Sequence, residues 1–172
     1  RADRLACATP ARRDTMNVTL REITADTVRQ VNRLNVKPDQ QGLVARNSES
    51  LSQALFCPEA WYRAIYADGE PVGFVMLYDE SLRAAPPAQP QAYLWRLMVD
   101  ARFQGRGIGA AALEQVIAHV RARGVFASLF VSYVPGPQSP EGFYLRAGFR
   151  HTGKVDEGEV VLELPLSPPA GP

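Results

Sequence analysis

The chain has 172 residues, of which 46% are hydrophobic and 22% are charged, and its formal net charge is +1. This composition is typical of a globular protein long enough to form one domain with a core. The nearly balanced charge gives no basic field for nucleic acid or an anionic membrane, and no apolar run approaches the length of a membrane span.

The two cysteines, Cys7 and Cys57, lie far apart without metal-ligand spacing, so we expect unpaired thiols in a cytoplasmic protein. No signal-peptide pattern opens the sequence. Residues 1–15 have no apolar period and Met16 directly precedes the first strand-like run, which predicts a poorly ordered N-terminal extension before a single domain at 16–166. The Pro-rich tail at 167–172 cannot continue a strand.

The first half of the chain predicts a strand, two helices and a hairpin. Residues 17–23 alternate between apolar and polar types, as a half-buried strand does. A helix at 24–34, capped by Thr24, and a second helix at 48–55 follow. The buried faces of these helices would hold Val28, Val31, Leu34, Leu51, Ala54 and Leu55. Residues 61–67 and 71–78 predict two strands joined by an Asp-Gly turn.

The second half predicts one helical crossover between strands. The run at 92–99 is strongly strand-like, and a helix at 107–123 follows it, with a strand at 126–133 after that. The stripe of the helix is Ile108, Ala111, Ala112, Val116 and Val120. A short helix at 140–147 and a final hairpin at 151–164, turning at 156–158, complete the order. This order predicts an α+β fold whose sheet is largely antiparallel.

Three glycines lie at the start of the helix that follows the strand at 92–99, in the sequence QGRGIG at 104–109. The first N–H groups of a helix have no partner within it, and that end of the helix is electropositive. Glycines let the backbone approach a ligand closely, and a phosphate or pyrophosphate is the natural occupant. Arg102 and Arg106 add positive charge. A loop whose glycines only turn the chain is the alternative.

Spacing excludes two other phosphate-binding classes. A P-loop needs Gly-Lys followed by Ser or Thr, and this segment has no lysine. The loop together with Ala110 matches the G-x-G-x-x-A fingerprint of dinucleotide-binding proteins, but residues 100–104 separate it from its strand. In addition, no acid for a ribose lies between Glu114 and Glu141. The sequence therefore does not predict a nicotinamide cofactor.

The loop instead resembles the Q/R-x-x-G-x-G/A loop of the GNAT superfamily of acyl-CoA N-acyltransferases. WRLMVD at 95–100 and FYLRAGF at 143–149 stand where that family has its fourth strand and a Tyr…Gly-Phe helix end. In element order the resemblance covers residues 18–164. More narrowly, TLREIT, VGFVML, WRLMVD, QGRGIG and DEGEVVLEL are similar to bacterial spermine/spermidine acetyltransferases. The resemblance implies the GNAT fold, a mixed, mostly antiparallel seven-stranded sheet flanked by about four helices.

The resemblance also implies acetyl-CoA as co-substrate, with no metal. The loop N–H groups would bind its pyrophosphate, and the strand edge would pair with the pantetheine amides and aim one N–H at the thioester carbonyl. The implied cofactor-binding residues are Leu97, Met98, Val99, Gln104, Gly105, Arg106, Gly107, Ile108, Gly109 and Ala110. Tyr144 matches the catalytic family tyrosine that protonates the departing thiolate, since a phenol stays neutral at working pH. Alternatively, Tyr144 packs as an ordinary helix aromatic.

The sequence departs from the family at two points. Some relatives carry a basic carboxylate on the fourth strand, whereas residues 93–97 hold no acid. A chain of waters leading outward would replace this base. The candidates for its outer end are Glu49, Glu59 and Glu80. Pro137 occupies a position where the family often has an asparagine that contacts pantetheine, with Gln138 or Ser139 as substitutes.

The implied acceptor is a small primary amine, and the narrower resemblance implies a polyamine. It would attack directly in a ternary complex, because no Cys-His or Ser-His arrangement indicates an acyl-enzyme. Asp156, Glu157 and Glu159 can form either an acidic mouth for a cation or a solvated turn, and His119 is expected to face solvent. Alternative acceptors are a protein N-terminus and an aminoglycoside-type antibiotic, and a non-catalytic acyl-CoA-binding regulator is the alternative function. Nucleic acid and membrane are not expected partners, whereas the sheet edges of this superfamily imply a homodimer.

Overall fold

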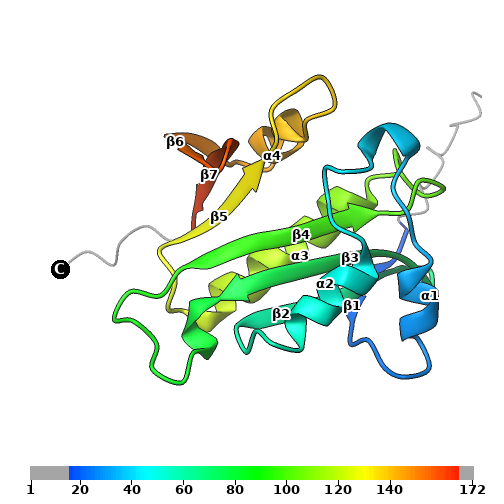
Figure 1. Ribbon diagram of the computed structural model, residues 1–172, viewed down its shortest axis with the longest axis horizontal. Coiled ribbons are helices and arrows are strands. Elements are labelled where there is room, and N and C mark those ends of the chain that lie inside the picture. Colours follow the sequence, from blue (N-terminus) through cyan, green and yellow to red (C-terminus); the bar gives the residue numbers. More distant parts are fainter. Residues whose placement is uncertain (1–15, 167–172) are drawn as a thin grey trace, which may run out of the picture.

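The computed structural model describes residues 16–166 (Figure 1). Its strands are β1 (Val18–Arg21), β2 (Ala60–Ala67), β3 (Glu70–Asp79), β4 (Ala92–Val99), β5 (Ser128–Tyr133), β6 (Arg150–Asp156) and β7 (Glu159–Pro165). Its α-helices are α1 (Val28–Asn32), α2 (Asn47–Ala54), α3 (Ile108–Arg123) and α4 (Glu141–Arg146), and the short 3-10 helices are η1 (Pro38–Gln40) and η2 (Glu80–Leu82). The predicted extension at 1–15 and the tail at 167–172 lie outside the described residues.

The strands form one seven-stranded sheet in the order β1-β2-β3-β4-β5-β7-β6. Every neighbouring pair is antiparallel except β4 and β5, which run parallel. Parallel neighbours need a long connection, and α3 supplies it. The α+β fold, with a mixed, mostly antiparallel seven-stranded sheet and four α-helices, is therefore confirmed.

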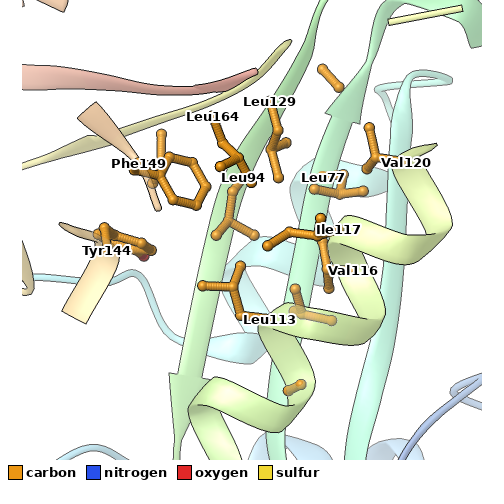
Figure 2. Close-up of a cluster of buried hydrophobic side chains, with 14 of the residues drawn as sticks. Leu77, Leu94, Leu113, Val116, Ile117, Val120, Leu129, Tyr144, Phe149 and Leu164 are labelled. Carbon is orange, nitrogen blue, oxygen red and sulfur yellow. The ribbon is translucent and has the colours of Figure 1, made fainter. Parts of the chain in front are cut away.

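Helices cover both faces of the sheet, with α2 on one side and α3 on the other (Figure 1). Under α3 and α4 lies the larger cluster of buried side chains, part of which is drawn in Figure 2. Its members include Leu77, Leu94, Leu113, Val116, Ile117, Val120, Leu129, Tyr144, Phe149 and Leu164. A second cluster under α1 and α2 includes Val31, Tyr66, Phe74, Met76 and Met98. β4 contributes to both clusters, so its position is fixed from both faces.

The apolar face of α3 is wider than predicted. Its buried residues are Ile108, Ala112, Leu113, Val116, Ile117 and Val120. Leu113 and Ile117 were not in the predicted stripe, and Ala111 is only half-buried. A helix that packs over a sheet buries three to four residues per two turns rather than a narrow seam. Gly107 caps the N-terminus of the helix and Gly124 caps its C-terminus. Both lie in the left-handed region, with φ of 78° and 68°, a conformation that favours glycine.

The prediction that Thr24 caps the first helix is wrong, because α1 begins at Val28. The N–H of Thr24 donates to the hydroxyl of Thr27 at 2.9 Å, and this bond closes a separate turn before the helix. Threonine side chains compete with helix formation in this way. Val31 and Leu34 are nevertheless buried, as the apolar spacing predicts.

Two expectations about exposure are also wrong. Leu55 is 79% exposed, because it follows Ala54, the last residue of α2. His119 is half-buried rather than exposed, because it stacks on the Trp61 ring, with the ring centroids 4.2 Å apart. Burial lowers the pKa of His119, and the charges of Arg123 and Arg63 add to this effect. The imidazole thus belongs to the packing between α3 and β2.

Candidate active site

β4 and β5 diverge where the sheet changes from antiparallel to parallel pairing. They are paired only from Ala92 opposite Leu129 to Leu94 opposite Val131. Beyond this point β4 continues to Val99 with β3 as its neighbour, while β5 leaves it, and Figure 1 shows the two strands separating. The β5-facing edge of β4 therefore offers backbone N–H and C=O groups that a bound molecule can use, as an added strand would.

A cleft of about 530 Å³ lies along this edge and the start of α3. It is lined by Leu97, Met98, Val99, Phe103, Gln104, Gly105, Gly107, Ile108, Gly109, Ala110, Phe143 and Arg146. All the predicted cofactor-binding residues except Arg106 are in this set. The guanidinium of Arg106 instead donates to the carbonyl of Arg102 at 3.1 Å. Phe103, Phe143 and Arg146 were not predicted. Phe143 and Arg146 are three residues apart on α4, on either side of Tyr144 in the sequence, and this spacing was the available signal.

The glycines keep the floor of the cleft bare. Gly105 and Gly107 have φ of 77° and 78°, and a Cβ at either position would meet no atom within 4 Å. A Cβ at Gly109 would lie 3.5 Å from the Phe143 ring and 3.8 Å from Val99, so the backbone there is packed between two apolar walls. The first amides of α3 point outward at its electropositive end. Bare amides beside a polar strand edge fit a diphosphate with an extended amide-bearing arm.

Asp100 fixes the start of the loop. One carboxylate oxygen accepts from the Arg102 N–H at 3.0 Å and from its Nε at 2.8 Å, and the other accepts from the Asn35 N–H at 3.0 Å. Burial acts to raise the pKa of Asp100, but the hydrogen bonds from Arg102 and Asn35 outweigh it and hold the pKa below its usual value. The Gln104 side chain adds a second tie by donating to the Val99 carbonyl at 2.9 Å. Two side chains, Asp100 and Gln104, thus tie the glycine loop to its surroundings, and Gln104 ties it to β4.

Tyr144 lies beside the cleft rather than among its lining residues. It is 7% exposed, and its ring packs edge-on against Phe143 and Phe149. Figure 2 shows the ring at the margin of the buried cluster, with its hydroxyl end turned toward Leu94 and Leu113. Burial raises the pKa of the Tyr144 phenol far above its ordinary value, so the group keeps its proton at neutral pH.

A second pocket, called here the acidic pocket, has a volume of about 380 Å³. It is lined by Gly42, Leu43, Val44, Ala45, Trp95, Arg96, Leu97, Ser132, Tyr133, Val134, Asp156, Glu157 and Glu159. Leu97 lines both this pocket and the cleft, so the two meet at β4. The structure brings the three predicted acids to one wall. Arg96 was not singled out from the sequence, although a charged residue inside an apolar strand was the available signal.

The remaining predicted polar residues lie elsewhere. Glu59 and Glu80 form ion pairs with Arg83 at 3.4 and 3.2 Å, away from both cavities. Gln138 and Ser139, the suggested substitutes for the missing asparagine, are not among the residues that line the cleft. Glu49 is exposed on α2 and, like Glu59 and Glu80, lines neither cavity.

Two further features of residues 16–166 bear on the class of protein. This part of the chain holds no group of three or more His, Cys, Asp or Glu side chains placed to bind a metal ion. Among its helices, none combines the length and apolar character that a bilayer crossing requires.

Splayed parallel strands, a glycine loop at a helix start and a cleft along the strand edge define an acyl-CoA-dependent acyltransferase. A family model described as the acetyltransferase (GNAT) family matches residues 24–149. The chain belongs to this family and is an acetyl-CoA-dependent N-acetyltransferase, which confirms the resemblance, the enzyme class and the co-substrate expected from the sequence.

The chain is 26% identical to the spermine/spermidine N(1)-acetyltransferase of Bacillus subtilis over 157 residues, which cover 86% of this chain and 97% of that one. It is 32% identical to the L-2,4-diaminobutyric acid acetyltransferase of Streptomyces avermitilis over 105 residues, covering 60% and 55%. The crystal structure of PaiA N-acetyltransferase from Thermoplasma acidophilum, in complex with coenzyme A, shares the fold, with a TM-score of 0.62 and 18% identity over 87% of this chain and 99% of that one.

Proposed function

We propose that this enzyme transfers the acetyl group of acetyl-CoA to a primary amine of a small diamine or polyamine. The observation that carries the proposal is the meeting of two cavities at Leu97, one bounded by the glycine loop and one by Asp156, Glu157 and Glu159. A donor and an acceptor bound on opposite sides of β4 would place their reacting ends between the diverging strands. The relatives named for spermine, spermidine and diaminobutyrate acetylation support an acceptor with more than one amine.

In this proposal the chain positions and polarises the reactants. Acetyl-CoA supplies an activated thioester when bound. The N–H groups of 105–110 would hold the diphosphate, and the free edge at Leu97, Met98 and Val99 would bind the arm. One edge N–H would donate to the carbonyl oxygen as charge develops on it, and loss of such a contact typically costs about 3 kcal/mol of transition-state stabilisation.

Proton transfer would involve two sides of the site. The neutral phenol of Tyr144 can give its proton to the departing sulfur, and its high pKa favours the protonated form needed for this role. On the acceptor side, Asp156, Glu157 and Glu159 attract an ammonium group to the pocket, and water would carry its proton outward. Direct attack is proposed because it needs no nucleophilic side chain of the enzyme.

The test is thiol release from acetyl-CoA in the presence of an amine panel. The panel comprises spermidine, spermine, a diamine, a peptide with a free N-terminus and an aminoglycoside, each with its fully N-acetylated counterpart, which has no free amine, as a matched control. We expect release with the small diamines or polyamines and none with the acetylated forms. Release only with the peptide or the aminoglycoside would replace the proposed acceptor class. Binding of acetyl-CoA without release on any amine would favour a non-catalytic acyl-CoA-binding role.

A further inference from the structure

Arg96 is a cation on the wall of the acidic pocket, and a β-bulge puts it there. Met76 on β3 pairs with Arg96, whereas the next residue, Leu77, pairs with Leu94, so Trp95 is an extra residue in β4. A bulge of this kind breaks the alternation of side chains and re-aims the ones beside it. The guanidinium reaches toward α2, where its Nη2 donates to the side-chain oxygen of Gln53 at 3.4 Å.

The guanidinium of Arg96 is not neutralised within residues 16–166. Its Nη1 donates to the Trp95 carbonyl at 2.8 Å, and its Nε is buried without a hydrogen-bond partner among the described residues. The other half-buried arginines of this part have carboxylate partners, Arg63 with Glu22 at 3.6 Å and Arg83 with Glu59 at 3.4 Å. Burying a charge without a partner is costly. A site that retains such a charge is ready to bind an anion.

The three acids of the pocket do not supply that partner. Asp156 and Glu157 are exposed at the β6–β7 turn, and Glu159 accepts a hydrogen bond from the Ser132 hydroxyl. None of them forms an ion pair with Arg96 in the described structure, although Glu49 and Glu159 are near enough for their charges to favour its protonated form. The pocket therefore presents a cation at β4 and anions at the hairpin.

We propose that Arg96 binds a carboxylate of the acceptor, so that the preferred substrate is a diamino acid rather than a simple diamine or polyamine. The inference rests on the proposed acetyl transfer to a small amine. The planar fork of arginine matches a carboxylate and donates two parallel hydrogen bonds to it, which makes the contact both strong and directional. Asp156, Glu157 and Glu159 attract the ammonium end, and the opposite signs orient a zwitterionic molecule across the pocket.

The test compares 2,4-diaminobutyrate with 1,3-diaminopropane, which differ only by the carboxylate. We expect the wild-type enzyme to have the higher kcat/KM for diaminobutyrate. Arg96→Gln should lower that value by about 10- to 100-fold, because a hydrogen-bonded charge contact is lost. It should not lower the value for diaminopropane, which has no carboxylate to lose that contact. Arg96→Lys keeps the charge without the planar fork, so its kcat/KM for diaminobutyrate should lie between those of the wild type and Arg96→Gln. It replaces Arg96→Gln in the test if that variant does not fold.

Arg63→Gln is the matched control. Arg63 also lies on a strand, its Nη1 donates to the preceding carbonyl at 2.7 Å, and its guanidinium stacks over Trp61 as that of Arg96 stacks over Trp95. It is not among the residues that line the acidic pocket, so acceptor preference should not change. Equal losses for both acceptors in Arg96→Gln, or a wild-type preference for diaminopropane, would overturn the inference.

Equilibrium binding separates this inference from the proposed function. Calorimetry of the CoA-loaded chain should show diaminobutyrate binding that is weakened at least about tenfold in Arg96→Gln, with no weakening of diaminopropane binding. Thiol release from no amine, with this binding pattern intact, would reject catalysis and retain the carboxylate contact. Thiol release with equal diaminobutyrate affinity in wild type and Arg96→Gln would retain catalysis and reject the contact.

Discussion

Replacing Gly107 by alanine separates the ligand-binding role of the loop from its effect on folding. Gly107 has φ of 78°, and a Cβ there would meet nothing within 4 Å, so the cost comes from backbone strain alone. The left-handed region costs a residue with a Cβ about 1–2 kcal/mol, and the stiffer unfolded chain returns about 0.4–1 kcal/mol. We therefore expect a net loss of about 0.5–1 kcal/mol in the free energy of unfolding.

Gly153 provides the matched control, since it has φ of 79°, an equally open Cβ position and a place on β6 outside the cleft. Urea unfolding should show similar losses for Gly107→Ala and Gly153→Ala. Calorimetry should show that only Gly107→Ala weakens CoA binding, by at least tenfold or about 1.4 kcal/mol, because its methyl group enters the space above the loop amides. Wild-type affinity in both variants would refute the role of the bare amides.

Three further predictions concern the proton donor, the loop anchor and the core. Tyr144→Phe should lower kcat with little change in CoA affinity by calorimetry; unchanged turnover would remove this phenol from the reaction. Asp100→Asn should lower the free energy of unfolding at pH 7 by about 1–3 kcal/mol, because its charge-assisted hydrogen bonds are lost. Since the folded pKa of Asp100 is lowered, this difference from wild type should be complete above its ordinary pKa near 4 and shrink as the pH falls through the lower folded pKa; urea titrations that give a pH-independent difference would contradict the ion pair. Leu129→Ala, at a fully buried position, should cost about 2–5 kcal/mol in the same assay, and a cost below about 1 kcal/mol would contradict the packing under α3.

Local patterns were sufficient to predict much of the fold. The predicted strand at 92–99 coincides with β4 because its apolar run is bounded by turn residues at both ends. The hairpin turning at 156–158 is likewise confirmed, since Glu157 and Gly158 both have positive φ. The start of the first helix was missed because the hydroxyl of Thr27, rather than helix propensity, decides where the helix begins.

The candidate site depends more on contacts between distant segments. The glycine loop could be recognised locally, and the cleft contains all of its predicted residues except Arg106. The exposure of Arg96 to the acidic pocket depends on the register between β3 and β4, and a bulge cannot be located from one strand alone. The approach of the β6–β7 turn to the 42–45 loop is a property of the folded sheet and has no local sequence signal.

The central claim is that the loop amides and the free edge of β4 bind the acyl donor. A crystal structure of the chain with coenzyme A tests it most directly. We predict that the diphosphate contacts the N–H groups of 105–110 and that the thiol end lies between β4 and β5 near Leu97, where the two cavities meet. A diphosphate bound away from the start of α3, or a thiol that does not reach the gap between the strands, would contradict the account.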